Sequence, residues 1–173
     1  MKKILIIVDY QTEFVNGKFG FLQAENIENN IAEKIKEYRK DNATITFTLD
    51  THKDKVLYQF SGKLYSAKKC VGKHHEWRLF GEINELCKEN DLCFIKSSFA
   101  SMELFEYLRK KDFKKIEFAG VSADICVLAN AVIAKTACPR SEIIVDRNCI
   151  ASKNEKLLES AINIMESMKI IVI

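Results

Sequence analysis

Short runs of apolar residues alternate along the chain with segments in which apolar residues recur every three or four positions. The short runs predict strands at 4–8, 44–49, 92–95, 115–119, 142–145 and 170–173, of which the continuous run 4–8 is of the buried type. The periodic segments predict helices at 27–39, 79–88, 102–109, 126–137 and 153–167. This alternation is typical of a parallel sheet covered on both faces. It predicts an α/β, three-layer Rossmann-like fold with six mainly parallel strands.

The helical segments carry further detail. Ser101 is a suitable N-cap for the helix at 102–109. The segment 126–137 is almost uniformly apolar and small, so we expect it to be buried on most sides. The last helix is expected to turn five apolar side chains inward, namely Leu157, Leu158, Ala161, Ile164 and Met165.

The overall composition is that of an ordinary globular protein. The 173 residues are 47% hydrophobic and 29% charged, which fits a single domain spanning 1–173. The net charge of +3 is small and the lysine pairs are scattered, so no nucleic-acid partner is expected. The first apolar run stops at Asp9, too early for a secretion signal, and no stretch is long enough for a membrane span. We therefore expect a cytoplasmic protein without a membrane partner.

Three reactive side chains are expected at neighbouring strand ends. Asp9 follows the first predicted strand, Lys96 follows the third, and Cys126 follows the turn after the fourth. Because ligands bind at the carboxyl ends of parallel strands, we expect these side chains to meet. A helix start and the Lys96 ammonium would activate the Cys126 thiol, and Asp9 would accept its proton. Backbone N–H groups of Ser122 and Cys126 would face the oxyanion, which suits acyl transfer through a thioester.

Each of these residues also has an ordinary structural explanation. An aspartate after a strand is often a turn former, and a lysine at a strand end is usually solvated. The six cysteines include no C-x-x-C pair, and without a secretory signal they are expected to be reduced. Most are expected to be small apolar core residues. It is the combination of Asp9, Lys96 and Cys126 that favours a catalytic role.

The segment 51–78 has little periodicity but holds all three histidines and the single tryptophan. A segment of this length without regular structure is more often functional than idle. Trp77 in this segment, and Phe14 after the first strand, are candidate walls for a flat substrate. Ordinary packing is the alternative for both.

Four segments resemble the motifs of one family. VDYQTEFVNG (8–17) resembles its opening V-D-x-Q-x-D-F, and TLDTH (48–52) resembles its D-x-H segment. KSSFAS (96–101) resembles its lysine segment, and GVSADICV (120–127) resembles its nucleophile segment G-x-x-[ST]-x-x-C-V. In this order, and over essentially the whole chain, the sequence resembles the isochorismatase-like cysteine hydrolases, the family that includes nicotinamidases.

The resemblance implies roles for particular residues. Asp9, Lys96 and Cys126 would be catalytic, and a cis peptide between Val121 and Ser122 would shape the oxyanion hole. The implied reaction is hydrolysis of a small amide, in which a thioester forms on Cys126 and ammonia leaves. The resemblance also implies a homo-oligomer.

Nicotinamidases also hold a divalent metal of the zinc type, which binds the pyridine nitrogen. Asp50 and His52 match its first pair of ligands, so they are the candidate metal ligands here. Tyr58 and Lys69 stand where further histidines are expected, and a lysine ammonium has no lone pair to offer. Because the ligand set is incomplete, we expect no obligatory cofactor. The alternative for Asp50 and His52 is that they order the loop.

Three functions are compatible with this sequence. The first is a cysteine amidase acting on a small molecule, with nicotinamide as the leading candidate. The second is an isochorismatase-type hydrolase of another small metabolite, against which the presence of Cys126 argues. The third is a non-catalytic binding or redox module on the same scaffold.

Overall fold

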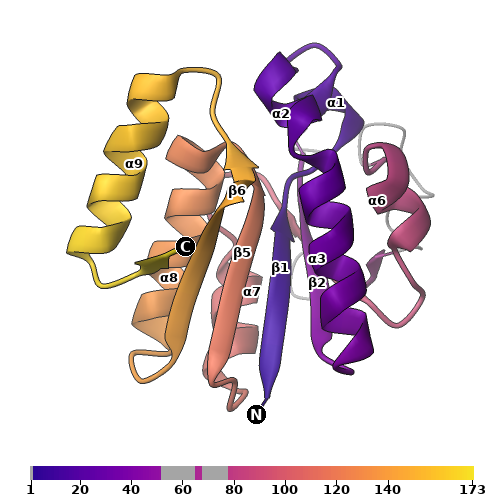
Figure 1. Ribbon diagram of the computed structural model, residues 1–173. Helices are drawn as coiled ribbons and strands as arrows, with labels where there is room; N and C mark the ends of the chain where they lie inside the picture. Colours follow the sequence, from indigo (N-terminus) through magenta and orange to yellow (C-terminus); the bar gives the residue numbers. More distant parts are fainter. Residues whose placement is uncertain (1, 52–64, 68–77) are drawn as a thin grey trace.

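A computed structural model describes residues 2–51, 65–67 and 78–173, which form a seven-stranded sheet with helices on both faces (Figure 1). The strands lie in the order β3-β4-β2-β1-β5-β6-β7. Their bounds are β1 Lys3–Val8, β2 Thr44–Asp50, β3 Tyr65–Ser66, β4 Leu92–Lys96, β5 Lys115–Val121, β6 Glu142–Ala151 and β7 Ile171–Val172. β3 pairs antiparallel with β4, and the other pairings are parallel. The α/β fold with six parallel strands is confirmed, and β3 adds a short antiparallel edge.

The five predicted helices are present, and two short helices precede them. Their bounds are α1 Thr12–Val15, α2 Leu22–Asn26, α3 Glu28–Lys40, α6 Gly81–Leu86, α7 Met102–Arg109, α8 Leu128–Ala137 and α9 Glu155–Ser167. A π-helical turn, η2 (Ala123–Val127), leads into α8. The helical segment that carries Cys126 therefore begins three residues earlier than the apolar pattern predicts.

The sheet separates two hydrophobic clusters, one under each helical layer. Along β1, Leu5 and Ile7 pack on the side of α3 and α6, whereas Ile4, Ile6 and Val8 pack on the side of α7, α8 and α9. All five side chains are fully buried, as expected for a central parallel strand. Figure 1 shows α3 in front of the sheet and α8 behind it.

The predicted helix details are partly confirmed. The Ser101 hydroxyl accepts a hydrogen bond from the Leu104 N–H at 3.1 Å, so it caps α7. The predicted inward face of α9 is wrong at two positions, because Leu157 is 50% exposed and Ile164 is 43% exposed. The buried residues of α9 are Leu158, Ala161, Ile162 and Met165.

Two broader features concern membranes and cysteines. Within the described ranges, no helix combines the length and apolar character that crossing a bilayer requires. Among the described residues, five cysteines are not joined in a disulfide, namely Cys87, Cys93, Cys126, Cys138 and Cys149. Four of them are buried, and Cys126 is the partly exposed one of the five.

Candidate active site

The carboxyl ends of three neighbouring strands bring charged side chains together. Asp9 directly follows β1, Asp50 ends β2, and Lys96 ends β4. Asp50 and Lys96 are paired residues in the β2–β4 register. Since β4, β2 and β1 are adjacent and parallel, residues that are distant in the sequence meet at one edge of the sheet.

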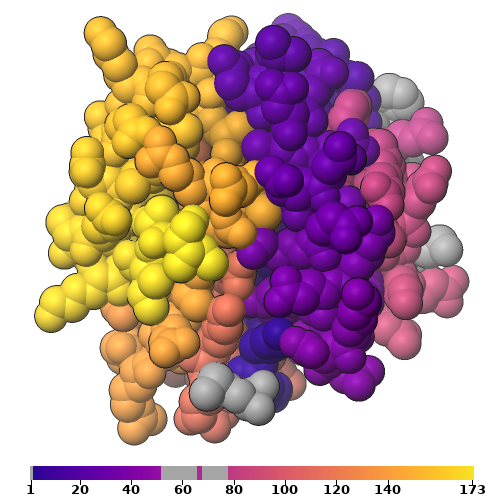
Figure 2. All heavy atoms as spheres, in the orientation of Figure 1, coloured from indigo at the N-terminus to yellow at the C-terminus, as the bar shows by residue number. Residues whose placement is uncertain are grey.

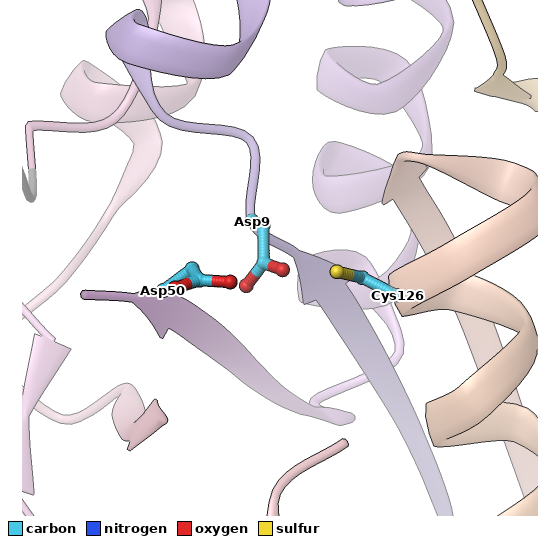
Figure 3. Close-up of side chains that lie close together, drawn as sticks. All are labelled: Asp9, Asp50 and Cys126. Atoms are coloured by element: carbon cyan, nitrogen blue, oxygen red, sulfur yellow. The ribbon is translucent and has the colours of Figure 1, made fainter. Parts of the chain in front are cut away.

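The Lys96 ammonium lies at the centre of the site. Its Nζ is 2.7 Å from Asp9 Oδ2, 3.0 Å from Asp50 Oδ2 and 3.5 Å from Cys126 Sγ. It also donates a hydrogen bond to the Ser98 carbonyl at 2.9 Å. The side chains of Asp9, Asp50 and Cys126 point toward one another from three separate elements (Figure 3). The structure therefore brings together the acid, the ammonium and the thiol named from the sequence.

Two polar residues that the sequence reasoning missed bond to the aspartates of the site, Thr48 to the Asp9 carboxylate and Gln11 to the Asp50 main chain. The Thr48 hydroxyl donates to Asp9 Oδ1 at 2.7 Å. The fully buried Gln11 donates through Nε2 to the Asp50 carbonyl at 3.1 Å, and its Oε1 accepts from the Asp50 N–H at 2.7 Å. The glutamine of the V-D-x-Q segment was a usable signal for Gln11. The role of Thr48 depends on the register of β1 against β2 and has no local signal.

Burial and mutual charge shift the titration of the three central groups. Burial raises the pKa of Asp9, and the nearby Lys96 ammonium only partly opposes this effect. Burial also raises the pKa of the Cys126 thiol, and the negative charge of Asp9 adds to the rise. Burial would lower the pKa of Lys96, but the charges of Asp9, Cys126 and Asp50 outweigh it and raise the pKa. Burial therefore disfavours the charged forms of Asp9 and Cys126, whereas the charged form of Lys96 is favoured. The lowering of the Cys126 pKa expected from Lys96 is outweighed by burial.

The turn before the nucleophile is held by its own side chains. The peptide bond between Val121 and Ser122 is cis, as the resemblance implies. The Ser122 hydroxyl donates to Asp124 Oδ1 at 2.6 Å, and the Ser152 hydroxyl donates to the same oxygen at 2.6 Å. Asp124 thus joins the turn that leads to Cys126 to the end of β6.

A buried asparagine joins the loop after Lys96 to the nucleophile helix. Asn130 lies on α8, one turn after Cys126, and its side chain is fully buried. Its Nδ2 donates to the Cys126 carbonyl at 2.7 Å and to the Phe99 carbonyl at 3.0 Å, while its Oδ1 accepts from the Ser101 N–H at 3.1 Å. Asn130 therefore links the backbone at Cys126 to the loop after Lys96, which includes Phe99 and Ser101.

Close approach of two strands explains the glycine of the nucleophile segment. Gly120 has a φ of +118°, a region that side chains disfavour. A Cβ there would lie 2.1 Å from the Val8 carbonyl oxygen, at the end of β1. The close approach of Gly120 to Val8 places the turn after β5 directly beside the end of β1, which Asp9 follows.

A cavity of about 290 Å³ opens onto the sulfur and the two aspartates. Its walls are mostly apolar, and among the described residues they include Phe14, Phe19, Phe21, Phe99, Val121 and Ile125. The rings of Phe14 and Phe19 are stacked, with centroids 5.9 Å apart. Phe14 therefore stands where a substrate wall was predicted, whereas Trp77 lies outside the described residues. The volume is at the lower end of that of small-molecule sites.

The metal prediction is tested in part by this geometry. One ligand atom from each of Asp9, Asp50 and Cys126 lies within 4.8 Å of the others. The space among them is taken by the Lys96 ammonium, which satisfies this donor set as a cation. Among the residues that the structure describes, this set therefore does not fit a divalent metal. His52, Tyr58 and Lys69 lie outside those residues, so a metal at Asp50 and His52 stays a prediction.

The chain is similar in sequence and in structure to several known proteins. The isochorismatase family protein PncA of Bacillus subtilis (strain 168) is 28% identical over 167 residues, which cover 90% of each chain. The solved structure of nicotinamidase PncA from Bacillus subtilis has a TM-score of 0.80 and 24% identity, covering 99% of each chain. Pyrazinamidase of Pyrococcus horikoshii, in complex with zinc, also has a TM-score of 0.80, with 19% identity, covering 100% of this chain and 99% of that one.

These structural likenesses, at identities under 25%, establish the fold. The family follows from the sequence match instead. The model of the isochorismatase domain matches residues 3–173, from the first strand to the last residue. The chain therefore belongs to the isochorismatase family.

Proposed function

We propose that the protein is a cysteine hydrolase that cleaves a small-molecule amide to a carboxylic acid and ammonia. One observation carries the proposal. Asp9 and Cys126 line the cavity, and the buried Lys96 ammonium lies 2.7 Å from the Asp9 carboxylate and 3.5 Å from the Cys126 sulfur. A base, a cation and a sulfur nucleophile at one point are what nucleophilic amide cleavage needs.

In the acylation step, Asp9 accepts the thiol proton as the Cys126 sulfur attacks the amide carbonyl carbon. The raised pKa of Asp9 favours this transfer, because a stronger base accepts a proton more readily. Lys96 stabilises the thiolate and the charged transition state while its own proton stays in place. The tetrahedral intermediate collapses when Asp9 returns the proton to the nitrogen, so that the C–N bond breaks and ammonia leaves.

In the deacylation step, water attacks the thioester carbonyl carbon. Asp9 accepts a proton from this water, the C–S bond breaks, and the carboxylic acid leaves. The proton on Asp9 then returns to the sulfur, which restores the resting thiol. The sum is one amide and one water converted into one acid and one ammonia.

The test is ammonia release from a panel of small primary amides. Nicotinamide and pyrazinamide are the first probes, because the structures named above are a nicotinamidase and a pyrazinamidase. Replacement of Cys126 by Ala should abolish release. Cys138→Ala is the matched control, because Cys138 is also a free thiol but is buried away from the cavity. Undiminished release by Cys126→Ala would refute the mechanism.

The same protein and its Cys126→Ala variant distinguish amide hydrolysis from the two alternative functions. Cleavage of isochorismate that survives Cys126→Ala would favour a vinyl-ether hydrolase. Failure to turn over any probe would favour a binding or redox module. The homo-oligomer and the cytoplasmic location stay predictions, which size measurement and fractionation would test.

A further inference from the structure

The charges around the cavity are unevenly distributed. Among the described residues that line it, the charged side chains are Asp9 and Asp50 at the floor and Lys153 elsewhere on the lining. The two floor aspartates share the Lys96 ammonium, so the floor carries more negative than positive charge. Apart from Ser122 and Cys126, the other described lining residues are aromatic or aliphatic. Among the described residues, Lys153 is therefore the cation that the cavity lining presents to a molecule bound against the apolar walls.

The ammonium of Lys153 is available for a ligand. The side chain is exposed, and within the described ranges no carboxylate lies within 4.0 Å of its Nζ. Lys96 differs in this respect, because it is engaged by Asp9, Asp50 and the Ser98 carbonyl. An unpaired ammonium beside an apolar cavity attracts an anion more strongly than one in open water, since the apolar walls lower the local dielectric constant.

The backbone around Lys153 is fixed relative to the nucleophile. The preceding residue, Ser152, is 2% exposed and donates to Asp124, the residue that also holds the turn before Cys126. The following residue, Asn154, caps α9 by accepting a hydrogen bond from the Lys156 N–H at 2.9 Å. Lys153 is therefore set between two anchored residues and keeps its position beside the cavity.

We propose that the substrates of this enzyme are small amides that carry an anionic group, a carboxylate or its equivalent, and that Lys153 binds this group. The floor would repel an anion, so the amide end lies against Cys126 and the anion lies toward Lys153, with an apolar body between them. Lys153 thus determines specificity. The inference rests on the proposed amide hydrolysis and adds to it the class of substrate.

The first experiment compares 4-carbamoylbenzoate with benzamide, which has the same ring and amide but no carboxylate. The ratio of kcat/KM for the anionic over the neutral amide should fall about fivefold in Lys153→Gln, the range of a partly solvated ion pair. Lys153→Arg should retain most of the ratio. Lys156→Gln removes the same charge from an exposed position outside the cavity lining and should keep the ratio. Equal ratios in Lys153→Gln and Lys156→Gln would overturn the inference.

A second experiment does not depend on turnover. Iodoacetate and iodoacetamide both alkylate a thiol, and only the former is an anion. Lys153→Gln should lower the ratio of Cys126 alkylation rates, iodoacetate over iodoacetamide, about fivefold relative to Lys156→Gln. If neither amide is hydrolysed, amide hydrolysis fails for these probes, and the alkylation ratio decides the role of Lys153. An unchanged ratio would show that Lys153 attracts no anion to the site.

Discussion

Among the described residues, two lysines each lie between two carboxylates, with a cysteine nearby, and only one of these clusters has the properties expected of a catalytic site. At the carboxyl ends of the strands, Lys96 Nζ lies 2.7 and 3.0 Å from two aspartates. Between α3 and the sheet, Lys34 Nζ lies 2.5 and 2.6 Å from a glutamate and an aspartate. The ingredients are nearly the same, so the difference must lie in what surrounds them.

The second cluster is saturated with hydrogen bonds. Glu117, on β5, is 1% exposed and is bonded by Lys34 and by the Tyr38 hydroxyl at 2.5 Å each, with Lys115 at 3.2 Å. Lys34 also reaches Asp146 on β6. Figure 2 shows the surface above this region, where the purple atoms of α3 lie beside the orange and yellow atoms of the C-terminal part. Lys34, Lys115 and the Tyr38 hydroxyl each stabilise the ionised carboxylate of Glu117.

The pKa values of the two carboxylates move in opposite directions as a result. Burial would raise the pKa of Glu117, but the bonds from Lys34 and Tyr38 outweigh burial and lower it. For Asp9, burial outweighs its partners and the pKa rises. A carboxylate with a lowered pKa is a weak base for the neighbouring Cys149, whose thiol is 1% exposed and has its pKa raised to about 12. In the proposed catalytic cluster the partners of Asp9 do not fully offset the effect of burial on its pKa, whereas in the second cluster the partners of Glu117 do.

The largest expected effect is on turnover at Asp9. Asp9→Asn keeps the shape of the side chain but cannot accept the thiol proton, so kcat should fall about 10³-fold. Steady-state ammonia release measures it. Glu117→Gln, the equivalent change in the other cluster, should leave kcat within about twofold. A comparable loss of kcat in both variants would break the contrast between the clusters.

The next effect is on stability at Glu117. Glu117→Gln removes the buried carboxylate that Lys34, Lys115 and the Tyr38 hydroxyl share, so the free energy of unfolding should fall by about 3 kcal/mol. Urea unfolding followed by circular dichroism measures it. Asp9→Asn should cost less, because burial already disfavours the charged form of Asp9 and raises its pKa, whereas the charged form of Glu117 is favoured. If Asp9→Asn proves the more destabilising of the two, the assignment of a structural role to Glu117 is wrong.

A smaller effect is expected at Asn130, which is uncharged but shares the first region with Lys96. Asn130→Ala removes three buried hydrogen bonds, so stability should fall by about 2 kcal/mol. Because the sulfur and the lysine loop are then less well positioned, kcat should fall about tenfold. Asn163→Ala on the exposed face of α9 is the control and should change neither quantity appreciably. Unaltered kcat in Asn130→Ala would show that the site does not need this connection.

The smallest effect is the pH dependence of stability, which should have opposite signs in the two clusters. The folded pKa of Asp9 is raised, so this residue reduces stability as pH rises above 3.8, the ordinary aspartate value. Asp9→Asn should therefore gain stability relative to wild type as pH rises toward neutrality. The slope is at most about 1.4 kcal/mol per pH unit for one proton.

Glu117 gives the reverse sign. Its folded pKa is lowered, so its stabilisation is present above 4.5, the ordinary glutamate value, and is lost as pH falls through the folded value. The deficit of Glu117→Gln should be largest near neutrality and should shrink in acid. Thermal unfolding across pH measures both variants, and parallel pH profiles would contradict the opposite shifts.

The sequence predicted the strands and the longer helices better than it predicted the short helices or the buried face of α9. The six parallel strands were found because each contains a short run rich in apolar residues. Such a run does not guarantee burial, since Ile171 on the edge strand β7 is 43% exposed. α1 and α2 were missed because four or five residues are too few to show a helical period. Leu157 and Ile164 were placed inward because an apolar residue near the edge of a helix face looks the same in sequence whether it is covered or not.

The residues that hold the site were harder to find than those that line it. The supporting hydrogen bonds are made by Thr48, Asp124, Ser152 and Asn130. Two of them join residues 39 and 28 positions apart in the sequence, and the others span 4 and 2 positions. The long-range pairs depend on how the strands and helices pack against one another. No local pattern reports them. Lys153 was likewise invisible as a cavity residue, because nothing in its neighbours distinguishes it from other surface lysines.

By itself, the sequence determined the order of strands and helices and the identity of the acid, the lysine and the cysteine that follow strand ends. Both depend on local patterns, because apolar periodicity and the position of a residue after a strand can be read within a short window. Only the tertiary structure decided which carboxylate keeps a raised pKa, which lysine is neutralised and which is free at the cavity. Those properties depend on desolvation and on partners brought from distant segments, which are energies of the folded arrangement and not of any segment alone.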